Sequence, residues 1–190
     1  MTDLDVRRVT ESDVQLLVPE HDEPDPEVSI VIPALNEELT IDDFVAWCHQ
    51  GLADAGVRGE VLIVDSSSDA TSELALAGGA RVLRTPKRGL GRAYIDALPH
   101  IRGRYVVMGD ADCTYDFRHL RDFVERFHDG YEFVMGSSRG PRPDAPGLDL
   151  RRVQAGRRSS DLRVRRHRVD GQGLAHVHAA MPSALGSDEE

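Results

Sequence analysis

The sequence predicts an α/β fold with a mainly parallel sheet in a doubly wound arrangement, and three observations support this. Short runs rich in Val and Ile alternate along the chain with segments whose apolar residues recur at helical spacing. Polar clusters follow the ends of these runs, at the edge where parallel sheets bind ligands. All aromatic residues lie between Phe44 and Phe133, which marks one core-forming region. Strands that alternate with helices need crossover connections, and such connections make the strands parallel.

Each expected element has a local signal. Apolar, often β-branched runs predict strands at residues 28–32, 61–64, 81–83, 105–108 and 131–135. Apolar residues three and four positions apart predict helices whose buried faces span residues 41–55, 71–77, 93–101 and 120–127. Gly56 and Gly78 are expected to end the first two helices, because glycine readily closes a helix. Asp116 is placed to cap the last helix.

Composition excludes several classes of protein. The chain has 190 residues, with 23 Lys and Arg against 33 Asp and Glu, a net charge of −10. No apolar run approaches the roughly 20 residues of a membrane-spanning helix. Cys48 and Cys113 make no disulfide framework, so a reducing cytoplasm is the expected location. The acidic balance argues against a nucleic-acid partner, because neutralising phosphates needs clustered positive charge.

Composition also divides the chain into three parts. Residues 1–27 hold nine acidic residues and two arginines, which predicts an acidic, mobile leader. Residues 28–137 carry the core signal and form the predicted domain. Residues 138–190 are rich in Arg and lack aromatic residues and Ile, which predicts a disordered tail. The abrupt change suggests a further hypothesis, that a reading-frame slip near Ser138 replaced the original continuation.

Asp110 and Asp112 are the strongest candidates for chemistry. The two carboxylates stand one residue apart, directly after the strand expected at residues 105–108. Such a pair can converge on one cation, and hard oxygen ligands suit Mg²⁺ or Mn²⁺. A solvated acidic turn is the alternative, and it is common for so short a string. The surrounding elements therefore have to decide between the two interpretations.

Residues 110–114, DADCT, match the DxDx(T/V) signature of haloacid-dehalogenase-like phosphatases. In that class Asp110 would be the nucleophile and Asp112 the acid or base. The signature belongs to a first strand, however, and here it follows the fourth expected strand. That class also needs a cation downstream of the pair, whereas the chain's one lysine, Lys87, lies upstream.

A more extensive resemblance rests on four ordered motifs: VSIVIPALNEE, VLIVDSSSDAT, RTPKRGLGRAYIDAL and VVMGDADCTYDF. In this order and spacing they resemble the family-2 glycosyltransferases of GT-A fold. The resemblance is greatest to the subgroup that makes polyprenyl-phosphate sugars, the dolichol-phosphate mannosyltransferase-like enzymes. It covers residues 28–137 and implies a Rossmann-like GT-A half that binds a nucleotide sugar, a UDP- or GDP-hexose, followed by an unstructured tail.

The resemblance implies roles for residues at four strand ends. Those that would hold the nucleoside are Pro33, Ala34, Leu35, Asn36, Glu37 and Asp65. Those that would face phosphate are Lys87, Arg88 and Gly89, where glycines and a helix N-terminus also favour anions on physical grounds. Asp110 and Asp112 would bind Mg²⁺ or Mn²⁺ and act catalytically through it.

Structural roles compete with several of these assignments. Asn36 and Glu37 also suit the start of a helix, where acidic side chains complement the helix dipole. Asp65 also suits a turn that caps the following helix, and both roles can hold together. Residues 87–91 also suit a glycine-rich turn with a solvated basic pair.

The resemblance implies a metal-dependent, inverting transfer of a hexose from a nucleotide-diphosphate sugar to a polyprenyl phosphate. Such an enzyme would be cytoplasmic, peripheral at the inner membrane face. A phosphate acceptor is already ionised near neutral pH, so it needs no general base. The alternatives are an inactive donor-binding fragment, because no acceptor half is recognisable after residue 137, and the phosphatase.

Overall fold

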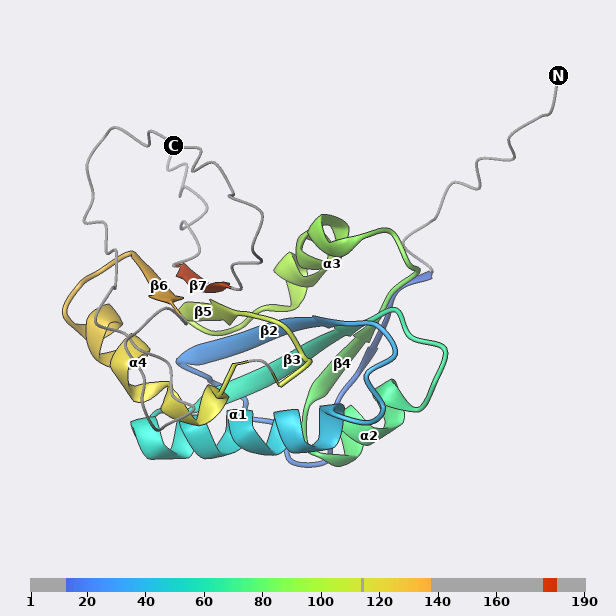
Figure 1. Ribbon diagram of the computed structural model, residues 1–190, viewed down its shortest axis with the longest axis horizontal. Helices are drawn as coiled ribbons and strands as arrows, with labels where there is room; N and C mark the ends of the chain where they lie inside the picture. Colours follow the sequence, from blue (N-terminus) through green and yellow to red (C-terminus); the bar gives the residue numbers. More distant parts are fainter. Residues whose placement is uncertain (1–12, 114, 138–175, 181–190) are drawn as a thin grey trace, which may run out of the picture.

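A seven-stranded sheet forms the centre of the described part of the chain, in the order β1-β4-β3-β2-β5-β7-β6 (Figure 1). The computed structural model describes residues 13–113, 115–137 and 176–180. The strands are β1 (Gln15–Leu17), β2 (Val28–Ala34), β3 (Gly59–Asp65), β4 (Arg81–Arg84), β5 (Tyr105–Met108), β6 (Phe133–Ser137) and β7 (His176–Ala180). β4, β3, β2 and β5 pair in parallel, and only β1 and β7 run the other way. The predicted α/β fold with a mainly parallel sheet is confirmed.

Helices cover both faces of the sheet, as a doubly wound arrangement requires (Figure 1). They are α1 (Ile41–Ala55), α2 (Thr71–Ala77), α3 (Leu90–Ala97) and α4 (Arg121–His128), with 3₁₀ turns η2 (Leu98–His100) and η3 (Phe117–His119). α1, α2 and α4 pack on one face and α3 on the other. Among the described residues, no helix is both long enough and apolar enough to cross a membrane.

The central strand β2 is buried on both sides. Ile30 and Ile32 belong to the core beneath α1 and α4, whereas Val31 belongs to the smaller core beneath α3. This division follows from the two-residue period of a strand, which sends alternate side chains to opposite faces. A strand covered on both faces reads as a continuous apolar run, which is the signal that predicted it.

Several element boundaries differ from those expected. The strand expected to end at residue 32 continues to Ala34, and the last expected strand begins at Phe133. The third helix ends at Ala97, because Pro99 turns the chain into η2. Asp116 caps η3 rather than α4, since its carboxylate accepts a hydrogen bond from the backbone N–H of Arg118 at 3.1 Å.

The prediction of a mobile leader is wrong for residues 13–27. β1 adds to the edge of the sheet antiparallel to β4, with Leu16 opposite Leu83. Asp22 accepts hydrogen bonds from the Arg102 guanidinium at 2.7 and 2.8 Å. A three-residue strand is too short to show a two-residue period, so the surrounding acidic residues concealed it. Residues 1–12 lie outside the described residues.

The prediction of an unstructured tail is wrong for residues 176–180. These residues form β7, which lies antiparallel between β5 and β6. The sequence HVHAA contains one β-branched residue and gives little strand signal of its own. Pairing with two neighbouring strands supplies what the local sequence lacks. The rest of the predicted tail lies outside the described residues.

A buried ionic network ties together the amino ends of the parallel strands. Glu60 of β3 is 3% exposed, and its carboxylate accepts a hydrogen bond from the Ser29 hydroxyl at 2.6 Å. Arg81 donates to it at 2.8 Å, and Arg102 donates from its backbone and its guanidinium. Burial opposes ionisation of Glu60, but the hydrogen bonds from Ser29, Arg102 and Arg81 outweigh it and hold its pKa below the usual value.

Replacing this carboxylate tests the network. Glu60→Gln is expected to lower the free energy of unfolding by about 3 kcal/mol, because it leaves Arg81 buried without its counter-charge. The folded pKa of Glu60 is depressed, so its contribution to stability is present at neutral pH and is lost as the pH falls below about 4. Urea unfolding at several pH values measures both effects. The exposed Glu125→Gln is the matched control, and an equal loss in both variants would contradict the prediction.

A close approach between α1 and η3 positions the segment that follows Asp112. A Cβ atom added to Gly51 would lie 2.0 Å from the carbonyl oxygen of Phe117. The Phe117 ring meets Phe44 of α1 edge to face, with ring centroids 5.0 Å apart. Glycine at position 51 therefore lets the 3₁₀ turn pack directly on the helix backbone.

Gly51→Ala is expected to destabilise the protein by about 2 kcal/mol, because the new methyl group must push η3 away from α1. Gly91→Ala is the matched control: position 91 is also helical, and an added Cβ there would meet no neighbouring atom. Since Ala favours helices over Gly, the control should be neutral or slightly stabilising. Thermal unfolding of both variants measures the difference, and a stable Gly51→Ala protein would refute the argument.

Candidate active site

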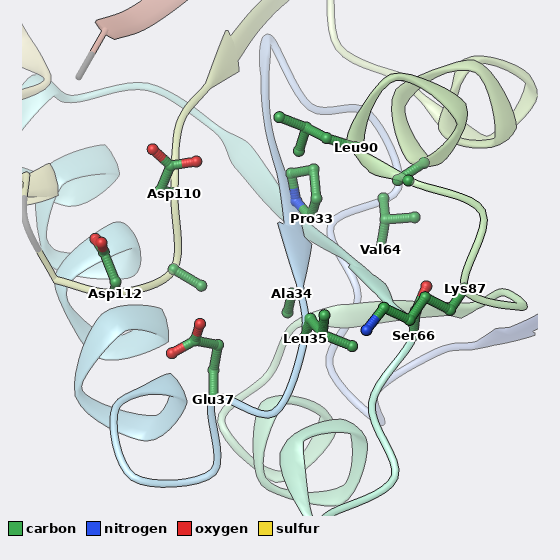
Figure 2. A pocket seen from close by; sticks show the side chains of 13 residues that line it. Pro33, Ala34, Leu35, Glu37, Val64, Ser66, Lys87, Leu90, Asp110 and Asp112 are labelled. Atoms are coloured by element: carbon green, nitrogen blue, oxygen red, sulfur yellow. The ribbon is translucent and has the colours of Figure 1, made fainter. Parts of the chain in front are cut away.

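A pocket of about 320 Å³ opens at the carboxyl ends of the parallel strands (Figure 2). Its lining residues are Pro33, Ala34, Leu35, Glu37, Val64, Ser66, Lys87, Gly89, Leu90, Ala93, Asp110, Ala111 and Asp112. Figure 2 shows the end of β2 in the middle, with the acidic side chains on one side and Lys87 and Ser66 on the other. Eight of the eleven predicted site residues therefore meet in one pocket, and Asn36, Asp65 and Arg88 lie outside its lining.

The loop after β5 presents Asp110 and Asp112 to the pocket. Ala111 between them is buried in the core, so the two flanking side chains turn outward. Figure 2 shows both carboxylates on the same side of the loop. Burial and the neighbouring charge of Asp112 raise the pKa of Asp110 above its usual value. A like-charged pair of this kind is relieved when a cation binds.

The donor set of this loop fits a hard divalent cation. Within the described residues, no three His, Cys, Asp or Glu side chains are arranged to hold a metal ion among themselves. Asp110 and Asp112 would therefore be joined by water or by ligand oxygens. Mg²⁺ is bound in this manner in many proteins, through one or two carboxylates together with substrate phosphates.

Thr40 connects the two acidic parts of the pocket. Its Oγ1 lies 3.1 Å from Oε2 of Glu37 and 3.3 Å from the carbonyl oxygen of Ala111. The hydroxyl thus lies between the loop after β2 and the loop after β5. The hydroxyl has one proton and both neighbours are acceptors, so it donates to one of them at a time.

Asn36 holds two loops together instead of lining the pocket. It adopts a left-handed backbone conformation, with φ of 58°. Its backbone N–H donates to Ser67 Oγ at 2.7 Å, and its side-chain oxygen accepts from the Ser68 N–H at 3.1 Å. The next residue, Glu37, donates its N–H to Thr71 Oγ1 at 2.9 Å. The loop after β2 is therefore fixed by the loop after β3.

Asp65 lies at the end of β3 and is 3% exposed. Its carboxylate accepts hydrogen bonds from the Ser67 N–H at 2.9 Å and from the Ser72 hydroxyl. Arg84 donates to the same Ser72 oxygen at 2.9 Å. Asp65 lines a neighbouring hollow of about 450 Å³, together with Asp69, Arg84 and other residues of the two loops. The turn-forming role expected for Asp65 is therefore present.

The two cations of the segment before α3 have different surroundings. Lys87 and Gly89 line the pocket, whereas Arg88 pairs with Asp96 at 2.6 Å. Asp96 also accepts from Arg92 at 2.9 Å. Gly89 precedes the helix with φ of 90°, a conformation that residues with side chains rarely adopt. Asp96 lies one helix length away from Arg88, so the pairing that removes Arg88 from the pocket was not evident from the motif.

Two tyrosines near the acidic pair were not expected from the sequence. Tyr94 of α3 donates its hydroxyl to the carbonyl oxygen of Gly109 at 3.3 Å. The buried Tyr115 follows the acidic loop. Burial and the charge of Asp110 raise the pKa of Tyr94 to about 12. Burial and the charges of both aspartates do the same for Tyr115, to about 12. Both phenols stay protonated at neutral pH. The sequence did not indicate either tyrosine as a neighbour of the acidic pair, because an aromatic residue at helical or strand spacing predicts only a place in the core.

Comparison with known families assigns the class. The chain matches the family model described as "Glycosyl transferase family 2" over residues 29–182, and it belongs to that family. The match includes residues 110–114, which favours the glycosyltransferase interpretation of the DADCT string over the phosphatase signature. The match also continues beyond residue 137, which counts against a reading-frame slip at that point.

Individual relatives are similar to part of this chain. It is 42% identical over 113 residues to the low-salt glycan biosynthesis hexosyltransferase Agl6 of Haloferax volcanii, covering 59% of this chain and 27% of that protein. It is 34% identical over 110 residues to the dolichyl-phosphate hexose transferase of the same organism, covering 58% of this chain and 47% of that protein. The similarity thus spans between about a quarter and a half of each relative.

The fold is also similar to a solved structure. Mannosyl-3-phosphoglycerate synthase from Rubrobacter xylanophilus superposes with a TM-score of 0.50 at 29% identity. The superposition covers 57% of this chain and 39% of that one. The fold is therefore that of a GT-A glycosyltransferase, and the predicted fold class and the predicted family are both confirmed.

The bridge made by Thr40 can be tested directly. Thr40→Val keeps the side-chain shape but removes the hydroxyl, so it should lower the free energy of unfolding by about 1 kcal/mol. Thr40→Ser keeps the hydroxyl and should lose much less. Urea unfolding measures both variants. A Thr40→Val protein as stable as the wild type, or a Thr40→Ser protein that loses as much as Thr40→Val, would contradict a stabilising role for the hydroxyl.

Proposed function

We propose that this protein binds a nucleotide-diphosphate hexose with a divalent cation and transfers the hexose, with inversion, to a polyprenyl phosphate. The observation that carries the proposal is the pocket that Asp110, Asp112 and Glu37 line together, with Lys87 on the other side of the end of β2. Membership of the family and similarity to a dolichyl-phosphate hexose transferase support the choice of donor and acceptor. The protein would work at the inner face of a membrane.

Different residues of the chain would bind different parts of the nucleotide-sugar donor. Asp110 and Asp112 lie where a diphosphate and its cation would meet the sheet edge, and the bound Mg²⁺ or Mn²⁺ would offset the charge of the leaving diphosphate. Lys87 and the N-terminus of α3 at Gly89 favour phosphate oxygens from the other side. The loop after β2 and the region around Asp65 are left for the nucleoside.

The acceptor needs little activation. In an inverting displacement, the acceptor oxygen bonds to the anomeric carbon of the hexose as the bond to the diphosphate breaks. A phosphate oxygen is already ionised near neutral pH, so no proton has to be removed from it. The absence of an assigned general base among the described site residues is consistent with this acceptor.

Calorimetric titration with UDP-glucose and GDP-mannose, with and without Mn²⁺, tests donor binding. One donor should bind in a Mn²⁺-dependent manner, and Asp112→Asn should weaken that binding by about 100-fold, because half of the carboxylate pair is lost. Asp54→Asn, an exposed substitution at the end of α1, is the matched control and should bind like the wild type.

The outcomes separate the alternatives. Failure of both donors to bind, or binding that ignores Mn²⁺, would overturn the proposed donor site. Binding without transfer of labelled hexose to a polyprenyl phosphate would support the inactive donor-binding fragment instead. Transfer that is lost in Asp112→Asn and retained in Asp54→Asn would support the full proposal.

A further inference from the structure

The outer surface of α3 is unusually apolar. Six large apolar side chains are exposed in the described residues, and three of them lie on or directly after α3. Leu90 is 59% exposed, Ile95 is 54% exposed and Leu98 is 64% exposed. Figure 1 shows α3 on its own face of the sheet, away from α1, α2 and α4.

The inner surface of α3, which packs on the sheet, contrasts with its apolar outer surface. The helix packs on the sheet through the buried Ala93 and Ala97 and the partly buried Tyr94. A surface helix ordinarily turns its large apolar residues to the core and its polar residues to solvent. Ile95 of α3 and Leu98 at the start of η2 instead face solvent, so these side chains contribute little to the core.

Positive charge accompanies the same helix. The turn before α3 and α3 itself, residues 87–97, contain three Lys and Arg and one acidic residue, Asp96, in a chain whose net charge is −10. Arg88 and Arg92 both pair with Asp96, so two cations share one counter-charge. The side chain of Arg92 is 51% exposed. An apolar strip beside cations is the composition of helices that lie in the headgroup region of anionic bilayers.

We propose that the α3 surface, defined here as Leu90, Ile95 and Leu98 with the flanking Arg92, docks on an anionic lipid bilayer. The apolar side chains enter the acyl boundary and Arg92 remains among the headgroups. The biological role of this docking rests on the proposed function, in which the acceptor is held in a membrane. Leu90 also lines the pocket, so docking places the pocket mouth where the phosphate of a membrane-held acceptor lies.

Vesicle flotation tests the docking surface. The full chain should float with vesicles of phosphatidylcholine that contain about 30% phosphatidylglycerol, and should float much less with phosphatidylcholine alone. Raising the salt from about 0.05 M to about 0.5 M should weaken the binding, because it screens the contribution of the cations.

Substitutions locate the surface. Ile95→Ser/Leu98→Ser should reduce partitioning about tenfold, because both apolar contacts are lost without adding charge. Ile95→Asp/Leu98→Asp should reduce it further. Leu39→Asp is the matched control: Leu39 is 91% exposed, precedes α1 on the other side of the sheet, and should leave binding unchanged. Because all variants keep the same C-terminal sequence, any contribution from it cancels.

Two results would overturn the proposal. One is unchanged flotation of both double variants with intact thermal unfolding midpoints. The other is sedimentation of the wild type as a dimer that the double variants abolish, since the surface would then bind a second copy. Donor titration of the same variants keeps the two proposals apart: lost flotation with intact donor binding concerns α3 alone, whereas flotation without any donor binding leaves docking standing and refutes the proposed function.

Discussion

Strand β2 pairs in parallel with β3 on one side and with β5 on the other. Ala34 lies opposite Asp65, and Val31 lies opposite Met108, so three chain segments leave the sheet along one edge. Slipping β2 by one residue would exchange the side chains that fill the core beneath α1 and α4 with those that fill the core beneath α3, and both cores would then be mispacked. Because β2 is buried on both faces, its register is fixed, and with it the distance between Glu37 and the acidic loop.

The two edges of the parallel sheet use charge in opposite ways. At the amino edge, Glu60 is buried and its carboxylate is satisfied by Ser29, Arg81 and Arg102. At the carboxyl edge, two aspartates lie side by side in an open loop, and burial and repulsion raise the pKa of one of them. Local rules for stability are most often broken at functional sites, and the acidic pair at the carboxyl edge breaks one of them.

Local patterns predicted most of the sheet and most of the pocket, because strands buried on both faces and polar strand ends are visible in short windows. The pairing of Arg88 with Asp96 was not predicted, since the glycine-rich sequence of residues 87–91 does not indicate which of its two cations faces the pocket. β1 and β7 were missed for a different reason: their few residues carry weak strand signals, and their neighbours in the sheet stabilise them. The burial of Tyr115 next to the charged loop was also not predicted, because burial close to charged groups has no sequence pattern.

The position of β7 has a consequence for how the molecule assembles. Among the described strands, β6 touches the sheet only through β7, which occurs about 40 residues later in the chain. During synthesis, β6 therefore emerges from the ribosome before the strand that will join it to β5. Contacts between residues so far apart in the chain form slowly compared with helices or hairpins, so this end of the sheet should be the last to form. Until then, β6 exposes two unpaired edges, the features that invite pairing between nascent chains.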